Sequence, residues 1–305
     1  MKSLKNVIFL LLADIIWGAA FVAQRTGGDV VGAYSFNCIR SLIGFLVLIP
    51  VILIMGKRET GATKRSDRRT LLVGGILCGV ALAFASNLQQ LGITLGSSVG
   101  KAGFLTACYI LIVPILGLFL HKKCGWNVAL GVLLAMIGLY FLCMKSGGFS
   151  LEKSDVLLLL CAFAFAVQIL AIDYFAPKVN PVSLSCVEFL VCGVLSAIPM
   201  FAVDMGHSRE GIVLWAQNLT TWDAWIPILY AGVCSCGIGY TCQIMGQRNF
   251  NPTVASLIMS LESAFSVLFG WLLLQESLSR RELMGVLLVF AAIIVAQIPA
   301  RKKLL

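Results

Sequence analysis

A carboxylate, Glu262, lies near the middle of an apolar run, 252–275, that is long enough to cross a bilayer as a helix. A charge at that depth is costly, so it normally faces protein or a water-filled cavity. Small hydroxyl residues surround it at helical spacing: Ser256, Ser260, Ser263 and Ser266. Such residues also allow helices to pack closely, so packing and a polar pathway are both interpretations of the serines. For Glu262 itself we favour a functional role or a role in a polar network over simple packing.

Three more charges lie well inside apolar runs, away from the ends of the runs: Asp14, Arg40 and Glu188. Asp14 and Glu188 are candidates for binding a proton, together with Glu262. A neutral or snorkelling Asp14 is an equally good interpretation. Arg40 is long enough to reach a carboxylate at mid-depth, and it could instead hold Glu262 in a structural ion pair.

Polar and aromatic side chains recur at helical spacing in several other apolar runs. Gln90 shares a helix face with Asn87 and Thr94. Tyr240 and Gln243 share a face with Cys236 and Gln247. We expect the solute-binding residues to be Trp17, Gln90, Thr106, Tyr109, Gln168, Tyr240, Gln243, Ser260 and Glu262. Hydrogen bonding between helices is the alternative role for the polar members.

The composition indicates a helical membrane protein. The chain has 305 residues, of which 59% are hydrophobic and 12% are charged, whereas about a quarter of the residues in a soluble domain are charged. The eleven cysteines are scattered, and the two histidines lie between apolar runs. Neither set predicts a metal site. The net charge of +9 indicates loops beside anionic lipid rather than nucleic-acid binding.

Ten apolar runs predict ten transmembrane helices. They lie at 7–24, 34–55, 71–91, 99–120, 126–144, 155–174, 182–203, 223–246, 253–274 and 283–299. The longer connection 204–222 contains an apolar segment that could rest on the membrane interface. If the N-terminus is inside, the inner segments hold about twice as many Lys and Arg residues as the outer ones. Both termini are therefore expected in the cytoplasm.

Matches between the two halves predict an internal repeat. Cys38 corresponds to Cys186, and the tetrapeptide Gly-Val-Leu-Leu occurs at 131–134 and again at 285–288. Each half contains five apolar runs, and an odd number of spans places the second half upside down relative to the first. Inverted repeats are typical of transporters whose site lies near the midplane, between the halves.

The chain resembles ten-span members of the drug/metabolite transporter superfamily, which have two EamA-type repeats. The resemblance rests on these residues: Trp17, Gly18, Phe21, Arg40, Pro114, Leu261, Glu262, Gly270, Trp271, Gln275 and Glu276. It implies an all-α integral membrane protein with a first repeat at 1–146 and a second at 147–305. Ser263 stands where many members have a proline after the glutamate, so a kink is not implied at that point.

The resemblance and the repeat predict a secondary active transporter that works by alternating access at the cell membrane. The expected solute is a small organic molecule such as an amino acid or a related metabolite. Protons are the candidate coupling ion. The alternatives are a multidrug or toxic-compound exporter and, in another class, an integral membrane enzyme or a non-transporting scaffold. No nucleophile–base pair, metal cluster or nucleotide-binding loop is recognisable, so no enzyme activity and no cofactor are expected. The chain is expected to be a monomer or a homodimer in the lipid bilayer.

Overall fold

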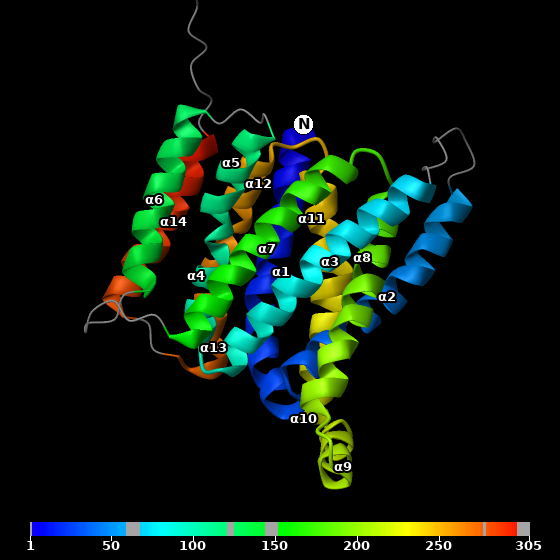
Figure 1. Ribbon diagram of the computed structural model, residues 1–305. Coiled ribbons are helices and arrows are strands. Elements are labelled where there is room, and N and C mark those ends of the chain that lie inside the picture. Colours follow the sequence, from blue (N-terminus) through cyan, green and yellow to red (C-terminus); the bar gives the residue numbers. More distant parts are fainter. Residues whose placement is uncertain (1, 59–67, 121–124, 144–151, 277–278, 298–305) are drawn as a thin grey trace, which may run out of the picture.

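The computed structural model describes the chain except for residues 1, 59–67, 121–124, 144–151, 277–278 and 298–305. Within the described residues, all regular secondary structure is helical, and the helices form one bundle (Figure 1). The first half contains α1 (Lys2–Val31), α2 (Ala33–Arg58), α3 (Arg68–Thr94), α4 (Val99–Ala107), α5 (Tyr109–Phe119) and α6 (Trp126–Cys143).

The second half begins with α7 (Lys153–Phe175) and α8 (Pro181–Pro199). A short π-helix, η1 (Met200–Asp204), follows α8 and leads to α9 (Arg209–Asn218). A longer π-helix, η2 (Tyr230–Gly239), joins α10 (Trp222–Leu229) to α11 (Tyr240–Gln247). The chain continues through α12 (Pro252–Met259) and α13 (Leu261–Leu274) to α14 (Arg280–Gln297).

Eight segments in the described chain are helical, long and apolar enough to cross a membrane. They are α1, α2, α3, α4–α5, α7, α8–η1, α10–η2–α11 and α12–α13. A shorter apolar helix, Ala129–Gly138, lies within α6, and α6 packs against α14. The structure therefore gives a multi-pass helical protein in which eight of the ten predicted spans have the length and hydropathy of a span.

The helix packing repeats between the two halves. Taken in order, α1, α2, α3, α4–α5 and α6 correspond to α7, α8, α10–η2–α11, α12–α13 and α14. The contact of α3 with α7 is repeated by the contact of η2 and α11 with α1. Likewise, α13 packs on α1 as α4 and α5 pack on α7. In Figure 1, α4 lies below α5 whereas α12 lies above α13, so these corresponding segments run in opposite directions.

Two corresponding segments are interrupted at mid-length, and neither interruption is at a proline. The helix breaks at Cys108, between α4 and α5, and at Ser260, between α12 and α13. At each break a backbone N–H bonds three residues back: Leu111 donates to Cys108, and Ser263 donates to Ser260. Such tighter turns offset the axes of the two helix pieces. The helix is thus interrupted three residues before Ser263 although the proline is absent.

The lower end of the bundle in Figure 1 is closed by contacts that involve the start of α4. Lys101 Nζ lies 2.7 Å from Asp155 Oδ1 and 3.1 Å from Glu152 Oε2, which joins α4 to the start of α7. The backbone N–H of Val99 donates to Glu276 Oε1, just after α13, at 3.1 Å. The helix α9 lies at the same end (Figure 1). It exposes Ile212, Val213 and Leu214, which agrees with the predicted interfacial segment.

Candidate functional site

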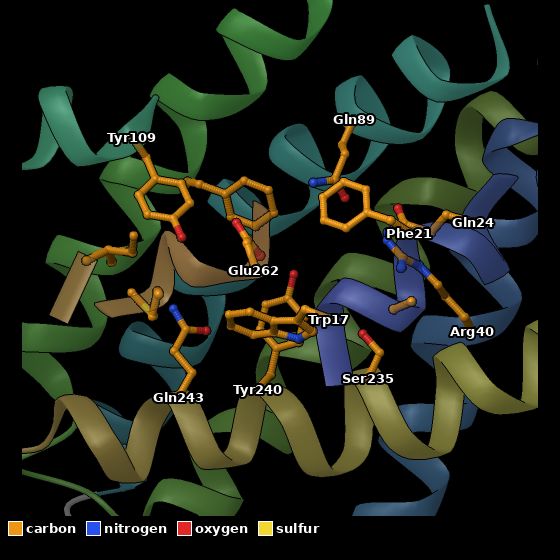
Figure 2. Close-up of a pocket in the computed structure, with 14 residues that line it drawn as sticks. Trp17, Phe21, Gln24, Arg40, Gln89, Tyr109, Ser235, Tyr240, Gln243 and Glu262 are labelled. Carbon is orange, nitrogen blue, oxygen red and sulfur yellow. The ribbon is translucent and has the colours of Figure 1, made fainter. Parts of the chain in front are cut away.

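A cavity lies in the middle of the bundle and is lined by both halves (Figure 2). Its volume is about 30 Å³, room for roughly two water molecules. The first half contributes α1, α2, α3 and α5, and the second half contributes α7, η2, α11, α12 and α13. The lining residues are Trp17, Ala20, Phe21, Gln24, Arg40, Gln89, Tyr109, Phe165, Ile169, Ser235, Tyr240, Gln243, Met259 and Glu262.

The break at Ser260 places Glu262 in the cavity wall, one residue into α13. Glu262 is 5% exposed, and within the described residues it forms no salt bridge, with Arg40 or with any other cation. The alternative role of Glu262, a structural ion pair with Arg40, therefore has no support among the described contacts. Figure 2 shows the Tyr109 hydroxyl, at the first residue after the other break, directed toward the Glu262 carboxylate. The two helix breaks thus bring an acid and a phenol together.

The serine stripe faces protein rather than the cavity. Each hydroxyl donates to the carbonyl three residues earlier: Ser256 to Thr253, Ser260 to Leu257, Ser263 to Ser260 and Ser266 to Ser263. Such bonds to the helix backbone tend to bend helices. A Cβ on Gly103 would overlap the Ser266 side chain, so α4 and α13 touch here. The packing interpretation of the serines therefore fits the structure, and the same bonds accompany the interruption of the helix at Ser260.

Aromatic rings form much of the cavity wall. The ring centroids of Trp17 and Tyr240 are 4.8 Å apart, and those of Phe189 and Tyr240 are 5.1 Å apart. Across the cavity, Tyr109 and Phe165 meet edge to face with centroids 6.5 Å apart. These contacts join α1 and α8 to α11, and α5 to α7, and they give the wall flat apolar surfaces.

A π-helix determines which residues before Tyr240 reach the cavity. Ordinary helical spacing places Cys236, four residues earlier, on the face of Tyr240. In η2 the turns are wider, and the backbone N–H of Tyr240 bonds to the carbonyl of Ser235, five residues earlier. Ser235 therefore lines the cavity beside Tyr240, whereas Cys236 does not line it.

Gln243 connects the cavity to a buried acid behind it. Its Nε2 donates to Gln168 Oε1 at 3.2 Å, and Gln168 Nε2 donates to Glu188 Oε1 at 2.8 Å. Both Gln168 and Glu188 are fully buried. Glu188 Oε2 has no hydrogen-bond partner within the described chain. The predicted residue Gln168 thus lies behind the cavity wall and links α11 to α8 through α7.

The other predicted residues are divided between the cavity and its surroundings. Trp17, Tyr109, Tyr240, Gln243 and Glu262 line the cavity. Around it, Gln90 Nε2 donates to the backbone carbonyl of Gln24 at 2.7 Å, and Thr106 Oγ1 accepts from Gln89 at 3.1 Å. Ser260 bonds to its own helix. Asp14 is fully buried, and neither of its carboxylate oxygens has a partner among the residues described.

Several lining residues were not predicted, although some carried a signal in the sequence. Phe21 and Gln24 follow Trp17 by four and seven residues, which is the spacing of one helix face. Gln89 lines the cavity in place of its neighbour Gln90. The two side chains are about 100° apart around the helix, so the polar face shared by Gln90, Asn87 and Thr94 was not the face that forms the wall. Arg40 was recognised as a buried charge but not as a cavity residue. Phe165, Ile169 and Met259 resemble ordinary apolar span residues and carried no signal.

The described residues contain no group of three or more His, Cys, Asp and Glu side chains that could hold a metal ion. The cavity therefore offers one arginine, one carboxylate, amides, hydroxyls and aromatic rings. Groups of these kinds fix polar organic molecules in protein pockets, and a carboxylate is a group that can exchange a proton.

Comparisons with known proteins identify the family of the chain. The model of the "EamA-like transporter family" matches the chain twice, over residues 4–144 and 152–297. An uncharacterized transporter of Archaeoglobus fulgidus is 25% identical over 98% of this chain and 87% of its own length. The uncharacterized transporter YoaV of Bacillus subtilis is 20% identical over 95% of both chains.

A WAT1-related chloroplastic protein of Arabidopsis thaliana is 23% identical over 95% of this chain and 69% of its own. A solved crystal structure superposes with a TM-score of 0.73 over 96% of both chains, at 16% identity, which shows that the fold is shared. Because the family match covers nearly the whole chain in two successive copies, this protein belongs to the EamA-like transporter family.

Proposed function

We propose that this protein is a secondary active transporter that moves a small organic solute, such as an amino acid or a related metabolite, by alternating access. The observation that carries the proposal is Glu262, a buried acid without a salt bridge among the described residues, in a cavity between two oppositely directed halves. Interrupted helices around a central site are a recurrent feature of transporters with inverted repeats.

The size of the cavity supports a conformational cycle. About 30 Å³ is too small for an organic solute, because binding pockets for such molecules are typically about 300–1,000 Å³. The wall must therefore move apart for the solute to bind. The contacts of Lys101 and Glu276 close one end of the bundle. We infer that the halves rock around the cavity and open its two ends in turn.

Glu262 is the proposed coupling residue. An acid at this depth can gain or lose a proton only when water or solute reaches it, so its protonation can be linked to the conformation. Asp14 and Glu188 remain further candidates for coupling. Each is buried, and among the described residues both carboxylate oxygens of Asp14 and the Oε2 atom of Glu188 have no hydrogen-bond partner. Trp17, Tyr109, Tyr240 and Gln243 are the proposed solute-binding residues in the wall, and Gln90, Thr106, Gln168 and Ser260 support them from behind.

We further propose that α6 and α14 complete a set of ten spans, with repeats at 1–146 and 147–305. Both contain apolar sequence and they pack against each other. By the distribution of Lys and Arg, both termini lie in the cytoplasm and the protein resides in the cell membrane.

The test is the variant Glu262→Gln, purified and reconstituted in vesicles. The change keeps the size and the hydrogen-bonding capacity of the side chain but removes its titration. Two readouts are needed: exchange of a mixture of ¹⁴C-labelled amino acids across vesicles preloaded with the unlabelled mixture, and accumulation of the same mixture driven by a proton gradient. We expect exchange to persist and accumulation to stop.

The matched control is Glu210→Gln, which neutralises an exposed carboxylate on α9 and should leave both activities unchanged. Thermal unfolding of each variant separates lost coupling from lost folding. Normal gradient-driven accumulation by Glu262→Gln would refute the coupling role. Absence of exchange by the wild-type protein, for this mixture, would count against transport of amino acids.

A further inference from the structure

Arg40 brings a positive charge into the cavity without a partner of opposite charge. It lies on α2, is 4% exposed and lines the same cavity as Glu262. No carboxylate in the described part of the chain lies within salt-bridge distance of its guanidinium. Its hydrogen bond there joins Nε to Asn37 Oδ1, at 2.8 Å. The terminal nitrogens Nη1 and Nη2 therefore remain available.

The surrounding residues hold Arg40 in one orientation. Asn37 accepts from Nε while its own Nδ2 donates to Ser86 and to Asn87, both at 2.9 Å. Asn87 in turn donates to Ser196 on α8 at 2.9 Å. The guanidinium carbon lies 5.6 Å from the centroid of the Phe36 ring. This network fixes Nε. It leaves Nη1 and Nη2 free to point into the cavity, toward Phe21 and Gln24 (Figure 2).

An arginine in this position cannot relieve its charge by losing a proton. A buried charge without a partner lowers the stability of a protein, so retaining one needs a compensating interaction. The missing partner must be an anion, because the free edge of the guanidinium offers two parallel N–H donors that match a carboxylate. Beside it, the Gln24 Oε1 acceptor is buried and has no partner among the described residues, so it could accept a hydrogen bond from a donor on the same molecule.

We propose that Arg40 binds the carboxylate of the transported solute. The inference rests on the proposed transport function and narrows it to solutes that carry a carboxylate. Aromatic walls formed by Trp17, Phe21 and Tyr240 would contact the rest of such a molecule. A cationic compound would meet the fixed positive charge of Arg40, so the site discriminates against exported cationic drugs.

The proposal makes a distinctive prediction about stability. If Arg40 were part of a structural ion pair, Arg40→Gln would leave a buried charge alone and destabilise the protein. If Arg40 instead gains a partner of opposite charge only when a ligand binds, the same change removes an uncompensated charge from the unliganded protein. We then expect the unliganded variant to unfold at the same temperature as the wild type or at a higher one. Arg25→Gln is the matched control, because Arg25 is paired with Asp29 at 3.2 Å and donates to the Ile93 carbonyl at 2.8 Å.

The binding test uses the purified full chain and two matched sets of probes. One set is L-phenylalanine, 3-phenylpropionate and phenethylamine; the other is L-leucine, 4-methylpentanoate and 3-methylbutylamine. Thermal stabilisation is titrated with each probe. We expect at least one carboxylate to stabilise the wild type while its amine analogue does not. Arg40→Gln should weaken that binding on the order of 30-fold or more, Arg40→Lys should retain part of it, and Arg25→Gln should retain all of it.

Four results would overturn the inference: stabilisation by the amines as strong as by the carboxylates, no stabilisation by any carboxylate, unchanged carboxylate binding by Arg40→Gln, or destabilisation of unliganded Arg40→Gln beyond that of Arg25→Gln. Exchange of the same probes across vesicles separates this failure from a failure of the transport proposal. Exchange of amines but not of carboxylates would keep transport and reject the role of Arg40. Exchange of no probe would count against both.

Discussion

Replacing Gly18 by alanine should disturb the cavity without changing any residue that lines it. Gly18 follows Trp17 on α1 and faces Phe265 on α13, three residues after Glu262. A Cβ at this position would overlap the Phe265 Cβ and would lie 2.8 Å from its carbonyl carbon and 3.0 Å from its Cα. Two of these atoms are backbone atoms, so no side-chain rotation can relieve the contact.

The magnitude follows from these distances. Carbon atoms in contact prefer a separation of about 3.5–4.0 Å, so α1 and α13 must move apart by roughly 1 Å. Forcing extra volume into a packed core costs about 1–3 kcal/mol. Alanine regains up to about 1 kcal/mol in the helix relative to glycine. We expect a net loss of about 1–2 kcal/mol, together with reduced solute exchange, because the displacement separates Trp17 from Glu262.

The matched control is Gly237→Ala in η2. Its added Cβ would lie 3.4 Å from Val47 Cγ1, an ordinary contact, so stability and exchange should be nearly unchanged. Both variants are compared by thermal unfolding in detergent and by amino-acid exchange in vesicles. Wild-type stability and exchange in Gly18→Ala would show that α1 and α13 can move apart without loss. That result would refute the view that their close packing holds the cavity residues in place.

Three further predictions concern contacts away from the cavity or access to it. Lys101→Met should lower the free energy of unfolding by about 2 kcal/mol, because it removes the salt-bridge partner of the buried Asp155. This value lies between those typical of buried and of exposed salt bridges. An unchanged midpoint of chemical denaturation would contradict the prediction. Gln168→Met should lower the free energy of unfolding by about 1–3 kcal/mol, because it removes two hydrogen bonds between helices. Wild-type stability of this variant in the same assay would show that the hydrogen bonds from Gln243 through Gln168 to Glu188 are not formed. In a cysteine-free background, the thiol of Gln243→Cys should react with a water-soluble thiol reagent faster than the thiol of Gln90→Cys, since only position 243 lines the cavity. Equal rates would argue against the set of lining residues given above.

The topology of the whole chain can be tested directly. A reporter fused after Leu305 should be active only as a cytoplasmic reporter, because ten spans return the chain to the side on which it began. The control is the same reporter fused within the α9 segment, which should give the opposite signal. A periplasmic or extracellular signal after Leu305 would reject both the orientation and the count of ten.

The sequence by itself determined the membrane class, most of the spans and the twofold repeat. Apolar runs long enough to cross a bilayer admit few other structures, because every backbone N–H and C=O group must be satisfied inside the helix. Local chemistry also determined helix starts: Asn180 and Asn251 each precede a proline and accept two backbone N–H groups, at the beginning of α8 and of α12. Glu262 was singled out for the same reason, since a charge at mid-span is costly anywhere in a membrane.

Only the tertiary structure decided which polar residues share the cavity. Helical periodicity assumes a regular helix, and the site is built where helices are irregular: the break at Ser260 directs Glu262, and the wide turns of η2 bring Ser235 rather than Cys236 beside Tyr240. The separation of Arg40 from Glu262 was equally beyond the sequence. Both charges are buried, and whether they neutralise each other depends on how α2 and α13 are placed in the bundle. Residue spacing within one segment does not encode that placement. The unpaired state of Arg40 is therefore a property of the fold, because Asn37 and its partners hold the guanidinium away from any described carboxylate.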